Sequence, residues 1–230
     1  MLTIDNLRVR YGGIEALHDV SIEVKQGESV LLVGSNGAGK SSLINAVVGL
    51  VPAVSGRIVF EGTDLSTISC PARARLGIGY SPEGRRVFSS LSVTENVMAG
   101  TTGIPVAQAR DNLEWMRKTF PLLEERGDQP ANQLSGGQQQ IVAIARAAST
   151  MPKLLLLDEP FLGLAPVWIG HVSDAIRALQ QRGTTILMTE QMARPALKLV
   201  DRAYVIRNGE VRRSGSVDEI RELALAEEYL

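Results

Sequence analysis

Apolar residues follow two different periods along this chain, and the change of period separates its predicted elements. Residues 2–10 and 20–33 alternate or run apolar in the manner of strands, with a turn signal at Gln26-Gly27. Further elements predicted in this part are a short apolar helix over 42–48 and strands over 55–60 and 76–80. The first third of the chain therefore predicts mostly β-structure around one buried helix.

The pattern changes between about residues 90 and 134. Apolar residues recur there at intervals of three and four, which is the spacing of one helix face: Val106, Ala109, Leu113, Met116 and Phe120. Strand-like alternation is absent from this stretch. We expect a helical insertion, and we expect its methionine and aromatic residues to belong to a core rather than to a ligand site.

Strand and helix alternate again after residue 135. A helix face is formed by Ile141, Ile144, Ala145 and Ala148. Strands are predicted over 154–157, 184–189, 204–207 and 210–213, with a short helical tail over 217–230. The dipeptide Asn208-Gly209 between the last two strands is typical of a type I′ hairpin turn. The whole pattern predicts an α/β fold.

Composition narrows the class of protein. The chain has 230 residues, of which 44% are hydrophobic and 21% charged, as in globular proteins. Its net charge of −1 lacks the basic excess of a dedicated nucleic-acid binder, so we expect no nucleic-acid partner. No signal-peptide pattern or membrane-spanning run is present, and Cys70 is the single cysteine, expected to be a partly buried thiol. These features predict a cytoplasmic protein.

The stretch from Gly34 to Ser41 fits G-x-x-x-x-G-K-[ST], the phosphate-binding loop, and lies between a predicted strand and a predicted helix. In that context backbone N–H groups converge on a phosphate at a helix N-terminus. Lys40 would reach the β- and γ-phosphates, and the Ser41 hydroxyl would coordinate Mg²⁺. The alternative is an ordinary glycine-rich turn with an exposed lysine. The nucleotide-binding candidates here are Gly34, Ser35, Asn36, Gly37, Ala38, Gly39, Lys40, Ser41 and Ser42.

A second helix start carries two glycines. Ser135 is followed three residues later by Gln138, which predicts a capping box, and Gly136-Gly137 lie between them. Glycines in a first turn are costly for a helix, so another group is expected to lie close against these backbone N–H groups.

A third motif is the leucine strand 154–157, which ends in Asp158-Glu159. Asp158 would support the Mg²⁺ shell and Glu159 would polarise an attacking water. The alternative is a strand that simply ends in solvated acids. Tyr11, just after the first strand, could stack on a purine or be buried in the sheet.

With Gly34–Ser41, Leu134–Gln138 and Leu154–Pro160 in this order, the chain resembles the nucleotide-binding subunits of ABC transporters over essentially its whole length. The resemblance implies one ATP-binding domain over 1–230 with ATP and Mg²⁺ as cofactors. Its fold would be a P-loop NTPase with a RecA-like α/β core (1–83 and 135–230), an antiparallel β subdomain and a helical subdomain (about 84–134).

By position, the resemblance gives Tyr11 the role of stacking on adenine. It implies that Ser135, Gly136, Gly137 and Gln138 form the signature, which contacts the γ-phosphate held by an opposite subunit. Two ATPase subunits, identical or different, would then sandwich two ATP molecules. Asp158 and Glu159 resemble the Mg²⁺-supporting carboxylate and the catalytic base.

Two positions depart from the commonest family pattern. Glu83 stands where a Gln usually links the nucleotide and Mg²⁺ to the membrane partner, and we count it among their ligands. Gln191 stands where a switch His usually follows a strand. Gln can bond a γ-phosphate but cannot become a cation, so no His titration is expected in the rate.

These departures, with the run from Pro82 to Phe88, resemble the smaller ATPase of branched-chain (hydrophobic) amino acid importers, although Phe161 replaces the usual Ser. The resemblance implies a peripheral protein on the inner face of the cell membrane. Its partners would be permease subunits, a second ATPase and, indirectly, an external solute-binding protein. Residues 85–88 are a candidate permease-docking patch, or alternatively a solvated basic turn beside a core Phe. An exporter subunit and a soluble ABC ATPase acting on ribosomes or DNA are the alternative functions.

Overall fold

The computed structural model describes residues 1–191 and 193–221. These residues form two compact units: unit 1 combines Met1–Leu76 with the chain from Thr185 onward, and unit 2 spans Gly77–Thr184. Each unit is described by itself. The predicted helical stretch 84–134 lies within unit 2, and the predicted division into core and helical subdomain stays a prediction.

Unit 1 contains an antiparallel sheet with the strand order β2-β1-β4-β5. Its strands are β1 (Leu2–Tyr11), β2 (Ile14–Val24), β4 (Ser55–Phe60) and β5 (Thr63–Asp64). The buried residues of β1 are Leu2, Ile4, Leu7 and Val9, which alternate as expected for a sheet with one covered face except at a register shift between Ile4 and Leu7. Strand β2 begins at Ile14, earlier than the predicted residue 20, because pairing with β1 extends the ladder back to Tyr11↔Ile14.

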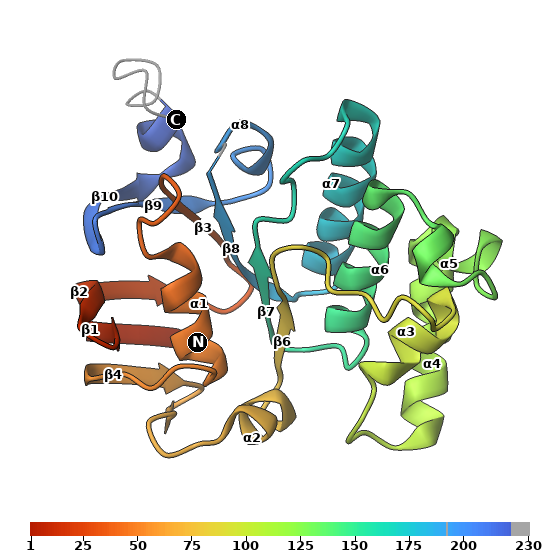
Figure 1. The fold of residues 1–230 in the computed structure, drawn as a ribbon, viewed down its shortest axis with the longest axis horizontal. Helices are drawn as coiled ribbons and strands as arrows, with labels where there is room; N and C mark the ends of the chain where they lie inside the picture. Colours follow the sequence, from red (N-terminus) through yellow and green to blue (C-terminus); the bar gives the residue numbers. More distant parts are fainter. Residues whose placement is uncertain (192, 222–230) are drawn as a thin grey trace. The chain divides into compact units, whose positions relative to one another are not determined.

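Unit 1 also contains the strand series β10-β9-β3-β8. Its strands are β3 (Ser29–Val33), β8 (Thr185–Glu190), β9 (Arg202–Arg207) and β10 (Glu210–Ser216), and its helices are α1 (Lys40–Val48), α2 (Cys70–Arg75) and α8 (Ala193–Ala196). Strand β3 pairs in parallel with both β8 and β9. Helix α1 lies against β1, β2 and β8, as Figure 1 shows. Positive φ angles at Asn208 (51°) and Gly209 (75°) confirm the predicted type I′ turn.

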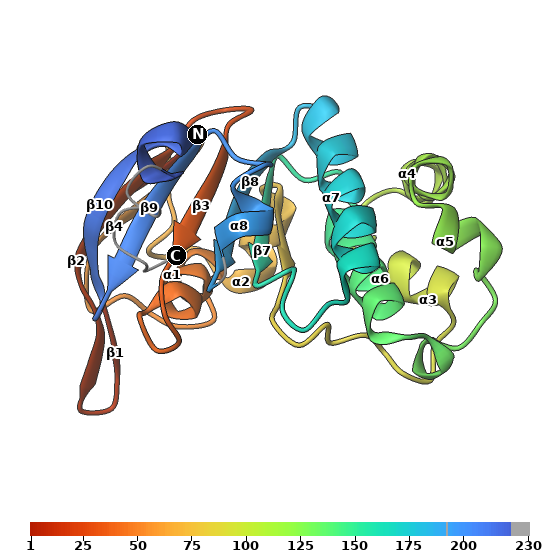
Figure 2. The ribbon, with the colours of Figure 1, turned by 90° about the horizontal axis from the view of Figure 1, so that it is seen from above.

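Unit 2 is built around one helix, α6 (Gly136–Ala148). Its other helices are α3 (Val93–Ala99), α4 (Val106–Thr119), α5 (Pro121–Glu125), the short 3₁₀ turn η1 (Ala131–Gln133) and α7 (Pro166–Gln181). Two parallel strands, β6 (Ile78–Ser81) and β7 (Leu154–Asp158), pack on α6, and so do α3, α5 and α7. Figure 2 shows α3, α4 and α5 grouped on one side of α6. The predicted helices between about residues 90 and 134 are therefore present, with Met116 and Phe120 buried as expected.

The predicted face of α4 needs one correction. Val106 is 66% exposed and lies in the first turn, whereas Asn112 is buried. Burial of Asn112 is explained by a hydrogen bond in which its Nδ2 donates to the Ser149 carbonyl at 2.8 Å. Of the predicted C-terminal helix, residues 217–221 are helical, and the remainder lies outside the described residues.

Candidate functional site

The glycine-rich loop of unit 1 joins β3 to α1, and its glycines are required by backbone contacts. A Cβ at Gly34 would lie 2.3 Å from the Ile206 carbonyl oxygen. Gly39 has φ +108°, and a Cβ there would lie 2.8 Å from the Ala16 oxygen. Because neither backbone neighbour can swing aside, only glycine fits at these two positions. The path of the loop is thus fixed by the strands that flank it.

The start of α1 has the features of an anion site. Gly39 is its N-cap, no side chain caps it, and no acidic residue lies in its first turn. The Lys40 ammonium is buried and donates to the carbonyl oxygens of Gly34 (2.8 Å) and Ser35 (3.1 Å). The loop thus curls around its own cation, while its tip, residues 35–37, is exposed. Uncapped N–H groups beside a held ammonium are the arrangement that binds phosphate.

Two further candidates of unit 1 lie at strand ends, and the strand pairing places one of them, Gln191, beside this loop. Strand β8 pairs with β3 in the register Val33↔Glu190, and the Gly34 N–H donates to the Glu190 backbone carbonyl oxygen at 3.2 Å. Gln191, the next residue, therefore follows β8 at the edge where the loop begins. Tyr11 ends β1 and is 44% exposed, so its ring is not buried in the sheet.

The acidic candidates of unit 2 gather at one edge of a strand pair. Strands β6 and β7 run parallel in the register Ser81↔Leu157, so Glu83 and Asp158-Glu159 follow at the same carboxyl edge. Asp158 and Glu159 are both buried, and Glu159 has a φ of 49°. A left-handed backbone is costly for a residue other than glycine and is concentrated at functional sites. The alternative of solvated acids at a strand end is therefore wrong.

The second glycine-rich helix start is capped. Ser135 is the N-cap of α6, and the predicted capping box is confirmed: the Ser135 N–H donates to Gln138 Oε1 at 2.8 Å, and the Gln138 N–H donates to Ser135 Oγ at 3.4 Å. A Cβ at Gly136 would lie 2.5 Å from Nη1 of Arg85, and one at Gly137 would lie 2.1 Å from the Trp168 ring. Two side chains of the same unit thus cover the glycines. Neither Arg85 nor Trp168 was expected in that place from the sequence.

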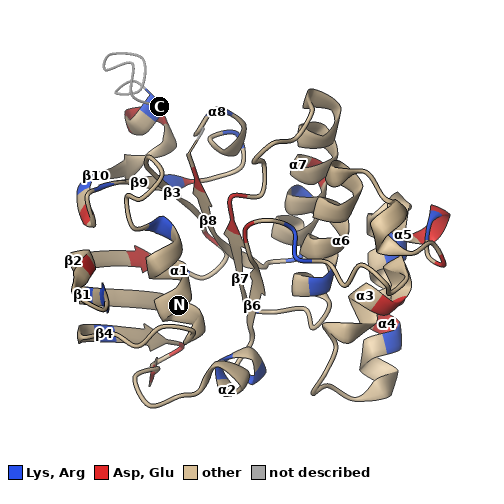
Figure 3. Cartoon of the chain, in the orientation of Figure 1, with Lys and Arg blue, Asp and Glu red and all other residues tan. Residues whose placement is uncertain are grey.

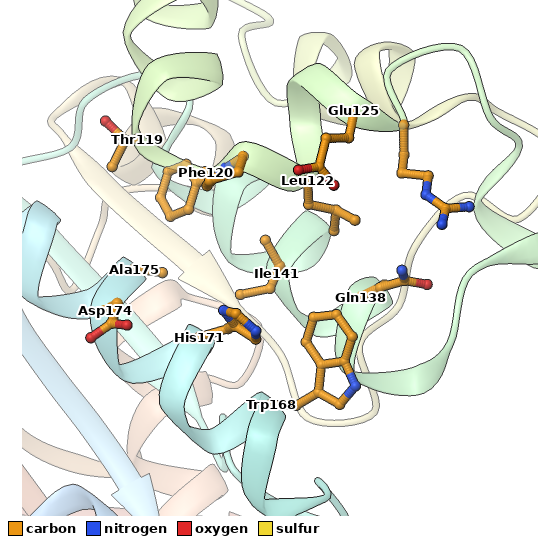
Figure 4. A pocket seen from close by; sticks show the side chains of 12 residues that line it. Thr119, Phe120, Leu122, Glu125, Gln138, Ile141, Trp168, His171, Asp174 and Ala175 are labelled. Carbon is orange, nitrogen blue, oxygen red and sulfur yellow. The ribbon is translucent and has the colours of Figure 1, made fainter.

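A cavity of about 390 Å³ adjoins this helix start within unit 2. Figure 4 shows Ile141 at its centre, with Phe120 and Leu122 on one side and Trp168 and His171 on the other. The Trp168 and His171 rings lie 5.1 Å apart, centre to centre. The Trp168 ring forms part of the cavity wall and also covers Gly137.

The loop that follows β6, residues 82–88, is the third part of unit 2 that bears on the site. Phe88 is 50% exposed, so the alternative of a core phenylalanine is wrong. Arg146, near the end of α6, donates from Nη2 to the Arg86 carbonyl at 2.6 Å, and its guanidinium carbon lies 4.8 Å from the centre of the Phe88 ring. Figure 3 shows basic residues both in this loop and on α6. The contacts of Arg146 could not be predicted from the sequence, because nothing in the pattern around an arginine on a helix indicates which groups it will bind.

Taken together, an uncapped helix start behind a glycine loop, a lysine held within that loop and a buried acidic strand end define the class of P-loop nucleotide-binding ATPases. A family model described as ABC transporter matches residues 17–162. The chain therefore belongs to the ABC transporter family, and it is an ATPase that serves as an ATP-binding subunit.

Individual relatives agree with this assignment. The chain is 47% identical to the high-affinity branched-chain amino acid transport ATP-binding protein BraG of Pseudomonas aeruginosa, covering 92% of this chain and 91% of that protein. It is 38% identical to the lipopolysaccharide export system ATP-binding protein LptB of Escherichia coli, covering 95% and 92%. Among solved structures, a nucleotide-free ATP-binding cassette from an ABC transporter superposes with a TM-score of 0.87 at 28% identity, covering 99% of this chain and 95% of that one.

Two kinds of feature are absent from the described residues. No helix there is long and apolar enough to span a membrane. No group of three or more His, Cys, Asp or Glu side chains in the same part of the chain is arranged to hold a metal ion.

Proposed function

We propose that this chain is the ATP-hydrolysing subunit of an ABC importer and powers uptake of branched-chain or other hydrophobic amino acids through partner permeases. The observation that carries the proposal is the 47% identity to BraG over 92% of the chain, against 38% for the export protein LptB. The local sequence agrees, because Glu83 and Gln191 are the departures expected of that importer ATPase.

In this proposal each ATP lies between two subunits, with the phosphate loop of one subunit on one side and the signature of the other subunit on the opposite side. Lys40 and the N–H groups of 34–42 hold the phosphates of one ATP, and Tyr11 stacks on its adenine. The signature, Ser135–Gln138, meets the γ-phosphate held by a second ATPase subunit, either a copy of this chain or a relative. Gln191 bonds the γ-phosphate as a neutral donor.

The residues present fit a magnesium ion. Mg²⁺ takes few protein ligands and prefers oxygen donors, and the candidates are Ser41, Asp158 and Glu83. The buried Ser81 hydroxyl at the carboxyl edge of β6 has no hydrogen-bond partner among the described residues, so this edge retains unused polar capacity. The ion would neutralise charge on the phosphates, while Glu159 orients and polarises the attacking water.

The Glu159→Gln variant tests the hydrolytic assignment. Gln keeps the shape of the side chain but cannot accept a proton, so turnover should fall by about 10²-fold or more. ATP-dependent dimerisation, measured by light scattering, should persist because the phosphate contacts remain. Asp174→Asn, an exposed acid on α7, is the matched control and should leave turnover unchanged. Near-normal hydrolysis by Glu159→Gln would remove Glu159 from the role of base.

We propose residues 85–88 of unit 2 as the surface on which the permease docks. Two arginines and a half-exposed phenylalanine offer both charge and apolar surface to a cytoplasmic helix of a membrane protein. Docking there would hold the chain on the inner face of the membrane, with an external solute-binding protein as an indirect partner.

Companions recovered with the tagged chain from its native membranes distinguish import from export. Two multi-span permeases with a second ATPase, and leucine uptake that depends on Glu159, would establish the importer. Recovery with lipopolysaccharide-export components would favour the alternative that the likeness to LptB supports. Recovery with ribosomes would overturn both transport functions.

A further inference from the structure

The 82–88 loop has a strained backbone. Gly84, Arg85 and Arg86 are three consecutive residues with positive φ, at 80°, 68° and 47°. The Arg86 N–H donates to the Gly84 carbonyl at 2.7 Å, which closes a tight γ-turn around Arg85. A γ-turn with a positive central φ is rare and unfavourable, and arginine lacks the freedom of glycine in this region. Such a turn persists only where its surroundings hold it.

Side chains from two helices hold this turn. Asn96 of α3 bonds both backbone groups of Phe88: its Oδ1 accepts from the Phe88 N–H at 2.8 Å, and its Nδ2 donates to the Phe88 carbonyl at 3.0 Å. Arg146 of α6 bonds the Arg86 carbonyl at 2.6 Å and stacks on the Phe88 ring. The loop is thus bound at Arg86, the last of its strained residues, and at Phe88, two residues further on.

Arg146 itself is incompletely satisfied. Its Nη1 is buried and has no hydrogen-bond partner among the described residues. Burial also lowers the pKa of its guanidinium, because the charged form loses solvation. An arginine retained for stability alone would be expected to bond all of its donors, since each buried unpaired N–H is costly. Its contacts with the loop therefore point to a different use.

The clamped loop meets α6 at both ends. Arg146 lies near the last turn of α6, and Arg85 covers Gly136, the first residue of the same helix. These two positions are separated by ten residues, or about 15 Å along a helix. A shift of the loop would therefore act on the signature turn directly, through the Arg85 guanidinium.

We propose that Arg146 is a positioning residue that holds the strained 84–86 turn, so that Arg85 lies on the signature turn and Glu83 has a fixed direction. A partner seated on Phe88 would compete with Arg146 for the ring, and in this way would report its presence to the signature. The inference rests on the proposed function of the signature and of the docking patch.

Steady-state kinetics of Arg146→Gln test the proposal. Gln lacks the planar guanidinium, so this variant loses both the contact with the Phe88 ring and the paired N–H donors. We therefore expect kcat for ATP hydrolysis to fall at least about tenfold. The ATP affinity of the isolated chain depends on the phosphate loop and should change less than about twofold. Arg146→Lys keeps the charge but not the fork and should recover less than half of the lost rate. Arg177→Gln, an exposed arginine on α7, is the matched control and should have no effect.

Hydrogen exchange supplies the readout that a merely structural role would not change. In Arg146→Gln the amides of 84–88 should exchange faster while the interior of α6 stays protected. Phe88→Leu, which keeps the Arg86 bond and loses the ring, should show a smaller change in both rate and exchange.

Two results would overturn the proposal: an unchanged kcat per folded chain in Arg146→Gln, or a lower melting temperature with unchanged exchange in 84–88. The first of these results requires a wild-type chain that hydrolyses ATP, whereas the second does not. Absence of wild-type hydrolysis would instead remove the proposed function, so the two failures are distinguishable.

Discussion

The two glycine-rich helix starts, at α1 in unit 1 and α6 in unit 2, use glycine for different reasons. At α1 the space of each missing Cβ is bounded by backbone oxygens, Ile206 O beside Gly34 and Ala16 O beside Gly39. At α6 the same space is bounded by side chains, Arg85 beside Gly136 and Trp168 beside Gly137. The first start has no side-chain cap, and the second has a complete capping box.

The difference shows which start is fixed and which can adapt. Backbone neighbours cannot rotate away, so the phosphate loop is preorganised for a ligand that binds it alone. Side-chain neighbours can be displaced, as expected of a surface that meets its ligand when a second subunit arrives. Helix α6 can tolerate this because its own N–H groups are already partly satisfied by the cap.

Gly34→Ala should have the largest effect. The new Cβ would lie 2.3 Å from a backbone oxygen, so the strands must separate or the loop must move. We expect a loss of about 3 kcal/mol in the free energy of unfolding, at the upper end of overpacking costs, and loss of ATP binding. Urea unfolding and nucleotide titration measure both, and wild-type values for either would contradict the backbone constraint.

Arg73→Met should follow closely. The buried Arg73 guanidinium, unlike that of Arg146, donates to four carbonyl oxygens at 2.6–2.9 Å, including Ala46 O and Val47 O at the end of α1. Methionine would remove all four of these buried hydrogen bonds, at a cost of about 3 kcal/mol, although the Ala46 and Leu65 oxygens would keep a backbone donor each, Gly49 N–H and Ile68 N–H. Thermal unfolding checks this, and a loss below about 1 kcal/mol would show that water replaces the guanidinium.

Ser135→Ala should cost about 1 kcal/mol, the usual value of an N-cap side chain. Ser92→Ala is the matched control, since Ser92 caps α3 with the same box. Both variants should lose similar stability, but only Ser135→Ala should also slow ATP turnover. Equal loss of turnover in the two would mean that stability alone explains the effect.

Gly136→Ala should have the smallest effect on stability. The new methyl group meets the far end of a flexible arginine, and alanine favours the helix, so the free energy of unfolding should change by no more than about 0.5 kcal/mol. ATP turnover should nevertheless fall, because Arg85 is displaced. A large loss of stability would show that Arg85 is held as firmly as backbone.

Much of this structure could be predicted because its signals are local. The period of apolar residues predicted the strands that end at Gly34 and Asp158. The dipeptide Asn208-Gly209 predicted its hairpin turn, and the spacing of Ser135 and Gln138 predicted the capping box. The face predicted for α4 was wrong at two residues. The spacing does not show that Val106, in the first turn, is exposed, and it does not count the polar residue Asn112, which is buried through one hydrogen bond.

The contacts of the arginines could not be predicted. Arg73, Arg85 and Arg146 are long side chains whose partners lie far along the chain or on backbone, and neither periodicity nor motif spacing encodes such pairings. The glycine pair at 136–137 did indicate a close neighbour. We expected a phosphate there, and the structure shows that Arg85 and Trp168 cover the glycines from within the same unit.

The central claim, that the start of α6 meets a γ-phosphate, is tested most directly by Ser135→Asp. Asp caps a helix as well as Ser, so α6 should keep its stability while the signature gains a negative charge. The measurement is ATP affinity and turnover of Ser135→Asp beside Ser92→Asp, which places the same change on α3. We expect normal ATP binding by both chains and loss of turnover in Ser135→Asp alone. Wild-type turnover in Ser135→Asp would contradict it.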